Sequence, residues 1–200
     1  MIQQSRPWQS TAWQAVAVPG AVAIGVLVLA GFALSAQAAP VETGQSEVKA
    51  TFKQFNVPVS GSFKKFSGDV QFDPGKPGET RALLTVETAS YDLGDPAYNK
   101  EVAGKDWFDS KNHPQATFVI TGVTGSGNSL QATGDLTLRG IRKPVKFPVK
   151  IHTTAGKHVF SGKTQIKRLD YKVGADGEWG DTSLVADEVV IDFRLVVPAR

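Results

Sequence analysis

The feature that most constrains the fold of this chain is an alternation of apolar and polar residues with a period of two. In the last segment every second position is apolar, at Val189, Ile191, Phe193, Leu195 and Val197. Asp192 and Arg194 lie between them. Because successive side chains of a β-strand point to opposite faces, the pattern predicts a strand with one buried and one hydrated face.

The same alternation returns in earlier segments, which turn-forming residues separate. These segments are residues 48–52, 66–72, 84–88, 116–120, 130–138, 145–151 and 160–166. The clusters between strands are Asp73-Pro74-Gly75, Gly125-Ser126-Gly127-Asn128, Thr154-Ala155-Gly156 and Gly174-Ala175-Asp176-Gly177. Short strands spaced by such turns are typical of a sandwich or a barrel. We therefore expect an all-β domain of about eight antiparallel strands.

Two places depart from the strand pattern. Asp95 and Pro96 can start a helix with proline in its first turn, so we expect a short helical insertion from Asp95 to Trp107 that covers one end of the strands. Pro148 falls inside an alternating segment and has no N–H for a strand ladder. We expect its strand to lie at an edge or to bulge there.

The N-terminal segment has the composition of an export signal. Arg6 is its only charged residue before Glu42, and an apolar stretch from Ala15 to Leu34 is followed by Ala36-Gln37-Ala38. Small residues at that spacing suit signal peptidase. We expect cleavage after Ala38, with residues 1–38 as signal peptide and 39–200 as one periplasmic domain. An uncleaved N-terminal membrane anchor is the alternative, because the apolar stretch approaches the roughly 20 residues of a membrane span.

Composition narrows the function further. The chain has no cysteine, which excludes disulfides and thiol catalysis and suits a periplasm better than a disulfide-rich extracellular setting. The net charge is only +3, and basic pairs such as Lys64-Lys65, Arg142-Lys143 and Lys167-Arg168 are interleaved with acids. We interpret these pairs as solvated strand edges and turns. Nucleic-acid binders concentrate basic residues in a patch, so we expect no nucleic-acid partner.

No motif of an enzyme or metal site occurs after residue 38. The nucleophile elbow, the zinc-protease motif, the Walker motif and the dinucleotide glycine motif are all missing from the sequence. His113, His152 and His158 include no pair with metal-ligand spacing. The acidic residues Asp170, Asp176, Glu178 and Asp181 match no EF-hand loop, and turn formation explains them. We expect no catalytic residue, no metal and no cofactor.

The sequence pattern does not decide whether the interior of the barrel holds a ligand or is filled by side chains. Small residues such as Gly134 and Gly162 inside strands mark bends or the close approach of a ligand. A barrel of about eight strands can hold one small ligand, or its side chains can fill it. Trp107, Phe108 and Trp179 are either a lipid entrance or a plug of core residues.

Four stretches stand out in a fixed order and spacing. They are GSFKKFSGDVQFDP (Gly61 to Pro74), WFDSKNHPQATF (Trp107 to Phe118), LTLRGIRKPV (Leu136 to Val145) and RLDYKVGADGEW (Arg168 to Trp179). Together they resemble the YceI-like polyisoprenoid-binding proteins over nearly the whole chain after residue 38. The resemblance implies a lipocalin-like antiparallel β-barrel, exported to the periplasm, that encloses a long isoprenoid or a similar amphiphile such as a quinone. It carries over no catalytic motif.

We therefore expect a non-enzymatic carrier of an isoprenoid lipid or quinone. The cavity-lining candidates are Phe52, Phe72, Val86, Trp107, Phe108, Phe118, Leu136, Phe147, Val149, Ile151, Phe160, Ile166, Ile191 and Phe193. The alternative is an interaction module with a packed barrel that docks on a membrane partner, such as a b-type cytochrome. An enzyme acting on lipid is disfavoured because no nucleophile and base are paired.

Overall fold

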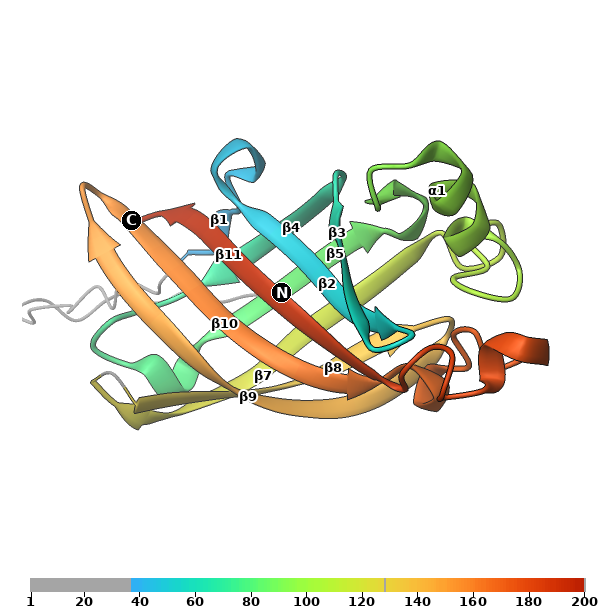
Figure 1. Cartoon of the computed structure of the whole chain (residues 1–200). Helices are drawn as coiled ribbons and strands as arrows, with labels where there is room; N and C mark the ends of the chain where they lie inside the picture. The colour runs from blue at the N-terminus through green and yellow to red at the C-terminus, as the bar shows by residue number, and fades with distance from the viewer. Residues whose placement is uncertain (1–36, 128, 200) are drawn as a thin grey trace, which may run out of the picture. The chain divides into compact units, whose positions relative to one another are not determined.

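The computed structural model describes residues 37–127 and 129–199, so nearly all of the expected signal peptide lies outside the described residues. The described part is mostly strand (Figure 1). The strands are β1 (Ala39–Pro40), β2 (Glu47–Gln54), β3 (Val57–Phe63), β4 (Phe66–Gln71), β5 (Arg81–Glu87), β6 (Tyr91–Asp92), β7 (Gln115–Ser126), β8 (Ser129–Leu138), β9 (Ile141–Thr154), β10 (Lys157–Lys167) and β11 (Glu188–Pro198). The helix is α1 (Pro96–Ala103), and the 3-10 turns are η1 (Thr43–Gln45), η2 (Pro77–Glu79), η3 (Thr88–Ser90), η4 (Arg168–Tyr171) and η5 (Gly177–Gly180).

All strands belong to one antiparallel sheet in the order β1-β4-β5-β7-β8-β9-β10-β11-β2-β3-β6. The sheet curls, and backbone bonds join its two arms. The amide of Val41 donates to the Gly68 carbonyl of β4, and the amide of Glu42 donates to the Val196 carbonyl of β11, both at 2.8 Å. The chain just after β1 thus connects one arm of the sheet to the other.

Within residues 37–127 and 129–199 the sheet has 11 strands rather than about eight, but every alternating segment of the sequence is a strand. The additional ones are β3 and the two-residue strands β1 and β6. Pro58 and Gly61 dilute the alternation in β3, and two residues are too few to show a period. For the described residues, the fold class, all-β and antiparallel with one short helix, is confirmed.

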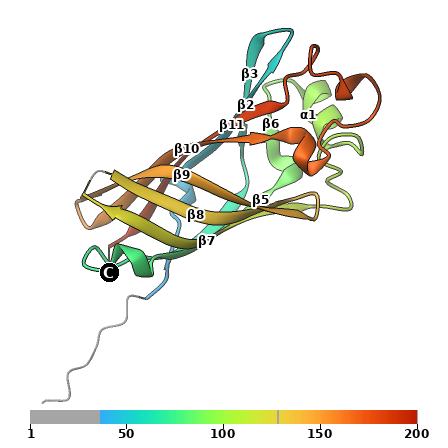
Figure 2. The same ribbon diagram turned by 90° about the horizontal axis from the view of Figure 1, so that it is seen from below.

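Strand β9 lies between β8 and β10 and is not an edge strand, contrary to the expectation for Pro148. Its ladder with β10 nevertheless ends at the pair Val149–Gly162, so residues 141–148 pair only with β8. The two strands separate toward the end where α1 lies (Figure 2). A Cβ at Gly162 would lie 2.9 Å from the Pro148 carbonyl oxygen, so glycine permits the close approach just where the ladder stops.

Helix α1 starts where the sequence predicts. The carboxylate of Asp95 accepts hydrogen bonds from the amides of Ala97 at 2.7 Å and Tyr98 at 3.3 Å, and proline occupies the first turn. The helix ends at Ala103, before Gly104, so it is shorter than expected and Trp107 lies beyond it. Among residues 37–127 and 129–199, no helix is long and apolar enough to cross a bilayer.

Candidate functional site: an apolar cavity under a cap

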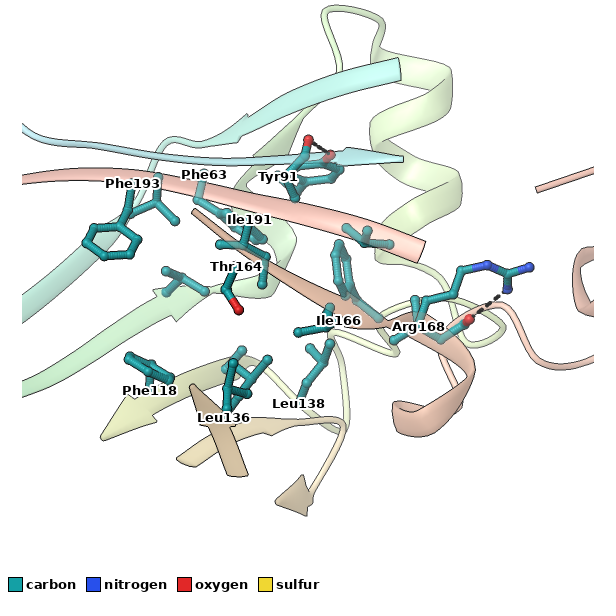
Figure 3. Close-up of a pocket in the computed structure, with 18 of the residues that line it drawn as sticks. Phe63, Tyr91, Phe118, Leu136, Leu138, Thr164, Ile166, Arg168, Ile191 and Phe193 are labelled. Carbon is teal, nitrogen blue, oxygen red and sulfur yellow. Dashed lines mark hydrogen bonds between the residues drawn. The ribbon is translucent and has the colours of Figure 1, made fainter. Parts of the chain in front are cut away.

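A cavity of about 140 Å³ lies inside the curled sheet, at the end that α1 covers (Figure 3). Its walls come from most strands of the sheet. Its cover, here called the cap, consists of α1, residues 104–113 and residues 168–187. The amide of Gly174 donates to the Asp106 carbonyl at 2.8 Å, which joins the two loop segments of the cap. The volume is close to the ~150 Å³ of an engineered apolar cavity that binds benzene.

Aromatic rings form the two ends of the cavity. At the inner end, here called the floor, the Phe147 ring lies 5.5 Å from the rings of Phe118 and Phe193. Under the cap, the Trp107 ring lies 6.3 Å from Phe52 and 5.5 Å from Trp179. Phe147 belongs to the second core cluster, whose other members, Val123, Leu130, Ala132 and Val149, fill the interior below the floor. One end of the fold is therefore hollow and the other is solid.

Among the described residues that line the cavity, Arg168 is the only charged one, and it has no N–H left for a ligand. Its Nε donates to the Ala186 carbonyl at 3.0 Å, and its Nη1 donates to the carbonyls of Val173 at 3.0 Å and of Gly174. Its Nη2 donates to the carbonyls of Trp179 at 2.6 Å and Val185 at 2.7 Å. A guanidinium has five N–H groups, and these bonds use all of them.

The charge of Arg168 lies outside the cavity proper. Figure 3 shows the guanidinium directed away from the other labelled side chains, so the stem of the residue forms the wall. Burial lowers the pKa of this guanidinium, and the charge of Asp187 opposes that shift. Arg168 is only 2% exposed. The interpretation of the Lys167-Arg168 pair as solvated is therefore wrong for Arg168.

The remaining polar groups on the lining are neutral. The Tyr91 hydroxyl donates to the Ala50 carbonyl at 2.7 Å, and burial raises its pKa well above the ordinary value. Thr117 and Thr164 contribute hydroxyl-bearing side chains, and Figure 3 shows that of Thr164 among the apolar residues of the wall. The cavity therefore suits an apolar ligand with no charge inside it.

Most of the residues predicted from the sequence line this cavity. They are Phe52, Val86, Trp107, Phe108, Phe118, Leu136, Phe147, Ile166, Ile191 and Phe193. Four predicted residues do not: Phe72, Val149, Ile151 and Phe160.

Those four residues point inward in the half of the fold that is filled. The Phe72 ring packs edge-on against Phe160 at 5.2 Å and His158 at 5.0 Å. Val149 belongs to the second core cluster, and Ile151 packs against both clusters. Alternation identifies an inward face, but it does not reveal where along the strand the interior is hollow.

Other lining residues were not predicted. They are Val48, Ala50, Phe63, Leu84, Tyr91, Val102, Ala116, Thr117, Leu138, Val145, Thr164, Arg168, Val173 and Val189. Several, such as Val48 and Val145, occupy the same inward positions of alternating segments, so the pattern contained their signal. Arg168 and Val173 lie in irregular chain, where no period marks an inward position.

Comparison with known proteins gives the family. A profile of the YceI-like domain matches residues 40–197. The chain belongs to the YceI-like family. It is 34% identical to "Protein YceI" of Escherichia coli O17:K52:H18 over 122 residues, which are 58% of this chain and 64% of that protein. A UPF0312 protein of Shewanella oneidensis is 31% identical over 76% of this chain and 85% of its own length.

Solved structures agree with this assignment. Burkholderia cenocepacia BcnA is 49% identical, with a TM-score of 0.75 over 78% of this chain and 98% of its own. A polyisoprenoid binding domain from Saccharophagus degradans shares the fold, with a TM-score of 0.63 at 18% identity over 82% of this chain and 98% of its own. Three of the four stretches that resembled the family begin at Trp107, Leu136 and Arg168, which all line the YceI-like cavity.

Proposed function

We propose that this YceI-like protein is a non-enzymatic carrier that holds an isoprenoid lipid or an isoprenoid quinone in the cavity under the cap. The observation that carries the proposal is the wall of the cavity. Its residues are almost all apolar, and its one charged group is fully bonded to backbone carbonyls. Such a wall binds hydrocarbon by burial and offers nothing to a charged substrate.

Membership of the family supports a binding role over an enzymatic one. The Saccharophagus neighbour, whose likeness concerns the fold alone, is named for binding polyisoprenoid. That name indicates the kind of ligand that this fold can enclose. The lining residues that the structure describes include no nucleophile with a paired base.

Tight binding of a long isoprenoid requires the cavity to enlarge, because the free energy gained depends on how many isoprene units are buried. Burying hydrocarbon contributes about 0.8 kcal/mol per methylene, or roughly 4 kcal/mol for one five-carbon isoprene unit. Association costs on the order of 4–15 kcal/mol, so tight binding needs several units enclosed. A space of about 140 Å³ holds about one ring. A longer chain therefore requires side chains of the floor or the cap to move aside.

We place this carrier in the periplasm because of its N-terminal segment. The stretch up to Ala38 reads as a cleavable signal. The first described strand, β1, begins at Ala39, which is buried at 3% exposure and pairs with Val70. A mature chain that starts at Ala39 keeps this strand.

Mass spectrometry of an organic extract tests the proposal. The protein is purified from the periplasmic fraction without detergent, and the extract is compared with that of the Val145→Phe variant, in which a larger side chain fills the cavity. An isoprenoid or quinone in the parent extract that is depleted in the variant is the expected result. A parent protein that carries no lipid and binds none when it is added contradicts the proposal.

A docking module remains the second candidate function, favoured by one observation. The tip of the β2–β3 hairpin exposes Phe55 at 65% and Val57 at 62%. Phe55 also has a φ of 50°, which is unfavourable for a bulky residue. Such a tip could contact a membrane partner such as a b-type cytochrome. If the protein is a docking module, Phe55→Ser should weaken binding of the partner. If the protein is a carrier, the same substitution should leave its lipid content unchanged.

A further inference from the structure

The wall of the cavity contains a place where two neighbouring strands do not pair. The ladder between β9 and β10 ends at the pair Val149–Gly162, before either strand ends. Among the described residues, 141–148 pair only with β8 and 163–167 pair only with β11. The space between these two segments is here called the seam, and it widens toward the end where α1 lies (Figure 2).

The sequence explains why the ladder stops at the seam. A continued register would bring Pro144 and Pro148 into the ladder, and neither has an N–H to donate. On the outer face it would place Lys146 diagonal to Lys163 and Lys167, all three exposed. Like charges so close together on neighbouring strands disfavour pairing. The seam is therefore built into the two strands.

Side chains from both margins of the seam line the cavity. Val145 and Phe147 come from β9, and Thr164 and Ile166 come from β10. Figure 3 shows Thr164 and Ile166 directed into the cavity. Val145 and Thr164 are half-buried, whereas the other two are buried. At the seam, side chains separate the cavity from solvent without a strand ladder.

An ion pair joins the two sides of the seam at the end near the cap. Nζ of Lys143 in β9 lies 3.1 Å from Oδ1 of Asp170, which follows β10. The two side chains are 39% and 48% exposed. An exposed ion pair stabilises a fold only slightly, so this contact breaks easily.

The cap is tied to the strands by hydrogen bonds on two sides. Arg139, in the turn between β8 and β9, donates to the Lys105 carbonyl at 3.1 Å and to the Asp106 carbonyl at 3.3 Å. On the other side, the amide of Ala186 donates to the Lys53 carbonyl of β2 at 2.9 Å. Lifting the cap breaks these bonds, whereas parting the seam breaks no ladder bond.

We propose that the ligand enters and leaves the cavity sideways through the seam while the cap stays in place, and that the ion pair between Lys143 and Asp170 holds the seam closed. The proposal rests on the proposed carrier function and adds the route of the ligand. The side chains of Val145 and Thr164 move apart to let a hydrocarbon chain pass.

A removable chemical bridge across the seam tests this route. The chain has no cysteine, so Lys143→Cys combined with Asp170→Cys places its only two thiols on opposite sides of the seam. A bis-methanethiosulfonate reagent joins the thiols in the folded protein, and a reductant releases them. The matched control bridges Arg139→Cys to Lys105→Cys, which fastens the cap instead.

Stopped-flow tryptophan fluorescence follows the binding of farnesol, because Trp107 lines the cavity. Bridging the seam should slow both association and dissociation at least about tenfold and change Kd less than about threefold, because a gate alters rates and not the equilibrium. Bridging the cap should leave both rates within about twofold of those of the reduced control variant.

Removing the ion pair should have the opposite effect. Asp170→Asn should raise both rates by about two- to fivefold, whereas Glu87→Gln, which removes the exposed pair with Lys65, should leave them unchanged. Rates that the seam bridge does not slow, or that the cap bridge slows as strongly, overturn the inference while the carrier function stands. If the protein without any bridge binds no farnesol, the carrier function itself is wrong.

Discussion

At the scale of single residues, Arg168 explains how an irregular cap is held over an apolar space. Residues 173–186 contain no strand and little helix, so many of their carbonyls lack the partners that regular structure supplies. The guanidinium supplies partners to five of these carbonyls. A basic pair in the sequence looks like a surface feature, and only the fold reveals that one of its members is internal.

Replacing Arg168 should therefore destabilise the fold strongly. Arg168→Met keeps the apolar stem but leaves buried carbonyls without donors, and we expect a loss of about 3 kcal/mol or more in the free energy of unfolding. Arg142→Met is the matched control, because the Arg142 side chain is 66% exposed beside Asp135 and should cost at most about 1 kcal/mol. Urea denaturation measures both values. Equal losses in the two variants would show that Arg168 does not organise the cap.

Ionisation of Tyr171 should make the stability of the fold depend on pH. Burial, and secondly the charge of Asp170, raise the pKa of Tyr171 from 10.0 to about 12. The folded state thus favours the protonated hydroxyl, so this stabilisation is complete below pH 10 and is lost as the pH rises toward about 12. In Tyr171→Phe the fall in unfolding free energy across this window should be shallower. Identical slopes for variant and parent would contradict the assignment.

At the scale of elements, local signals predicted strands and the helix start well. Each alternating segment is a strand. Asp95 and Pro96 predicted the start of the helix correctly, because helix initiation depends on neighbouring residues and not on the rest of the fold. The C-terminal end of the helix was not predicted, because the sequence around Gly104 has no clear helical period. Strand β3 was not predicted, because Pro58 and Gly61 interrupt its alternation of apolar and polar residues. The hollow and packed halves of the interior also have the same alternation, so only packing across strands separates them.

Two substitutions on β9 distinguish those halves. Val145 lines the cavity, while Val149, on the same face of the same strand, is 4% exposed in the second core cluster. Val149→Phe should overpack the core and cost about 1–3 kcal/mol of stability. Val145→Phe has space to enter, so it should cost less than about 1 kcal/mol and weaken isoprenoid binding at least about tenfold. Thermal unfolding and a binding titration measure both; a reversed order of stabilities would refute the placement of the cavity.

At the scale of the whole molecule, the predicted export signal and the residues of the proposed binding cavity come from different parts of the sequence. The signal up to Ala38 is a sequence-level prediction, and the described fold begins with the strand at Ala39. N-terminal sequencing of the periplasmic protein should therefore start at Ala39. A chain that starts at Met1 and is found in the membrane fraction would replace the cleaved signal by an anchor.

The family and the barrel-like sheet followed from the sequence, whereas the extent of the cavity did not. Four stretches in register were enough to indicate a YceI-like domain, which the matching profile confirms over residues 40–197. The cavity depends on how the floor, the cap and the separation of β9 from β10 combine. None of these three features can be predicted from a single segment, because each depends on contacts between residues far apart in the sequence.

The most direct test of isoprenoid binding in the cavity locates the bound ligand by isotope-filtered nuclear Overhauser contacts. Farnesol is added to labelled protein, and contacts are sought between its methyl groups and those of the cavity residues Leu136, Ile166 and Ile191 (Figure 3). Leu130, in the packed cluster, is the internal control. We predict contacts to the three cavity residues and none to Leu130. Bound farnesol that contacts only exposed residues such as Phe55 and Val57 would contradict this prediction.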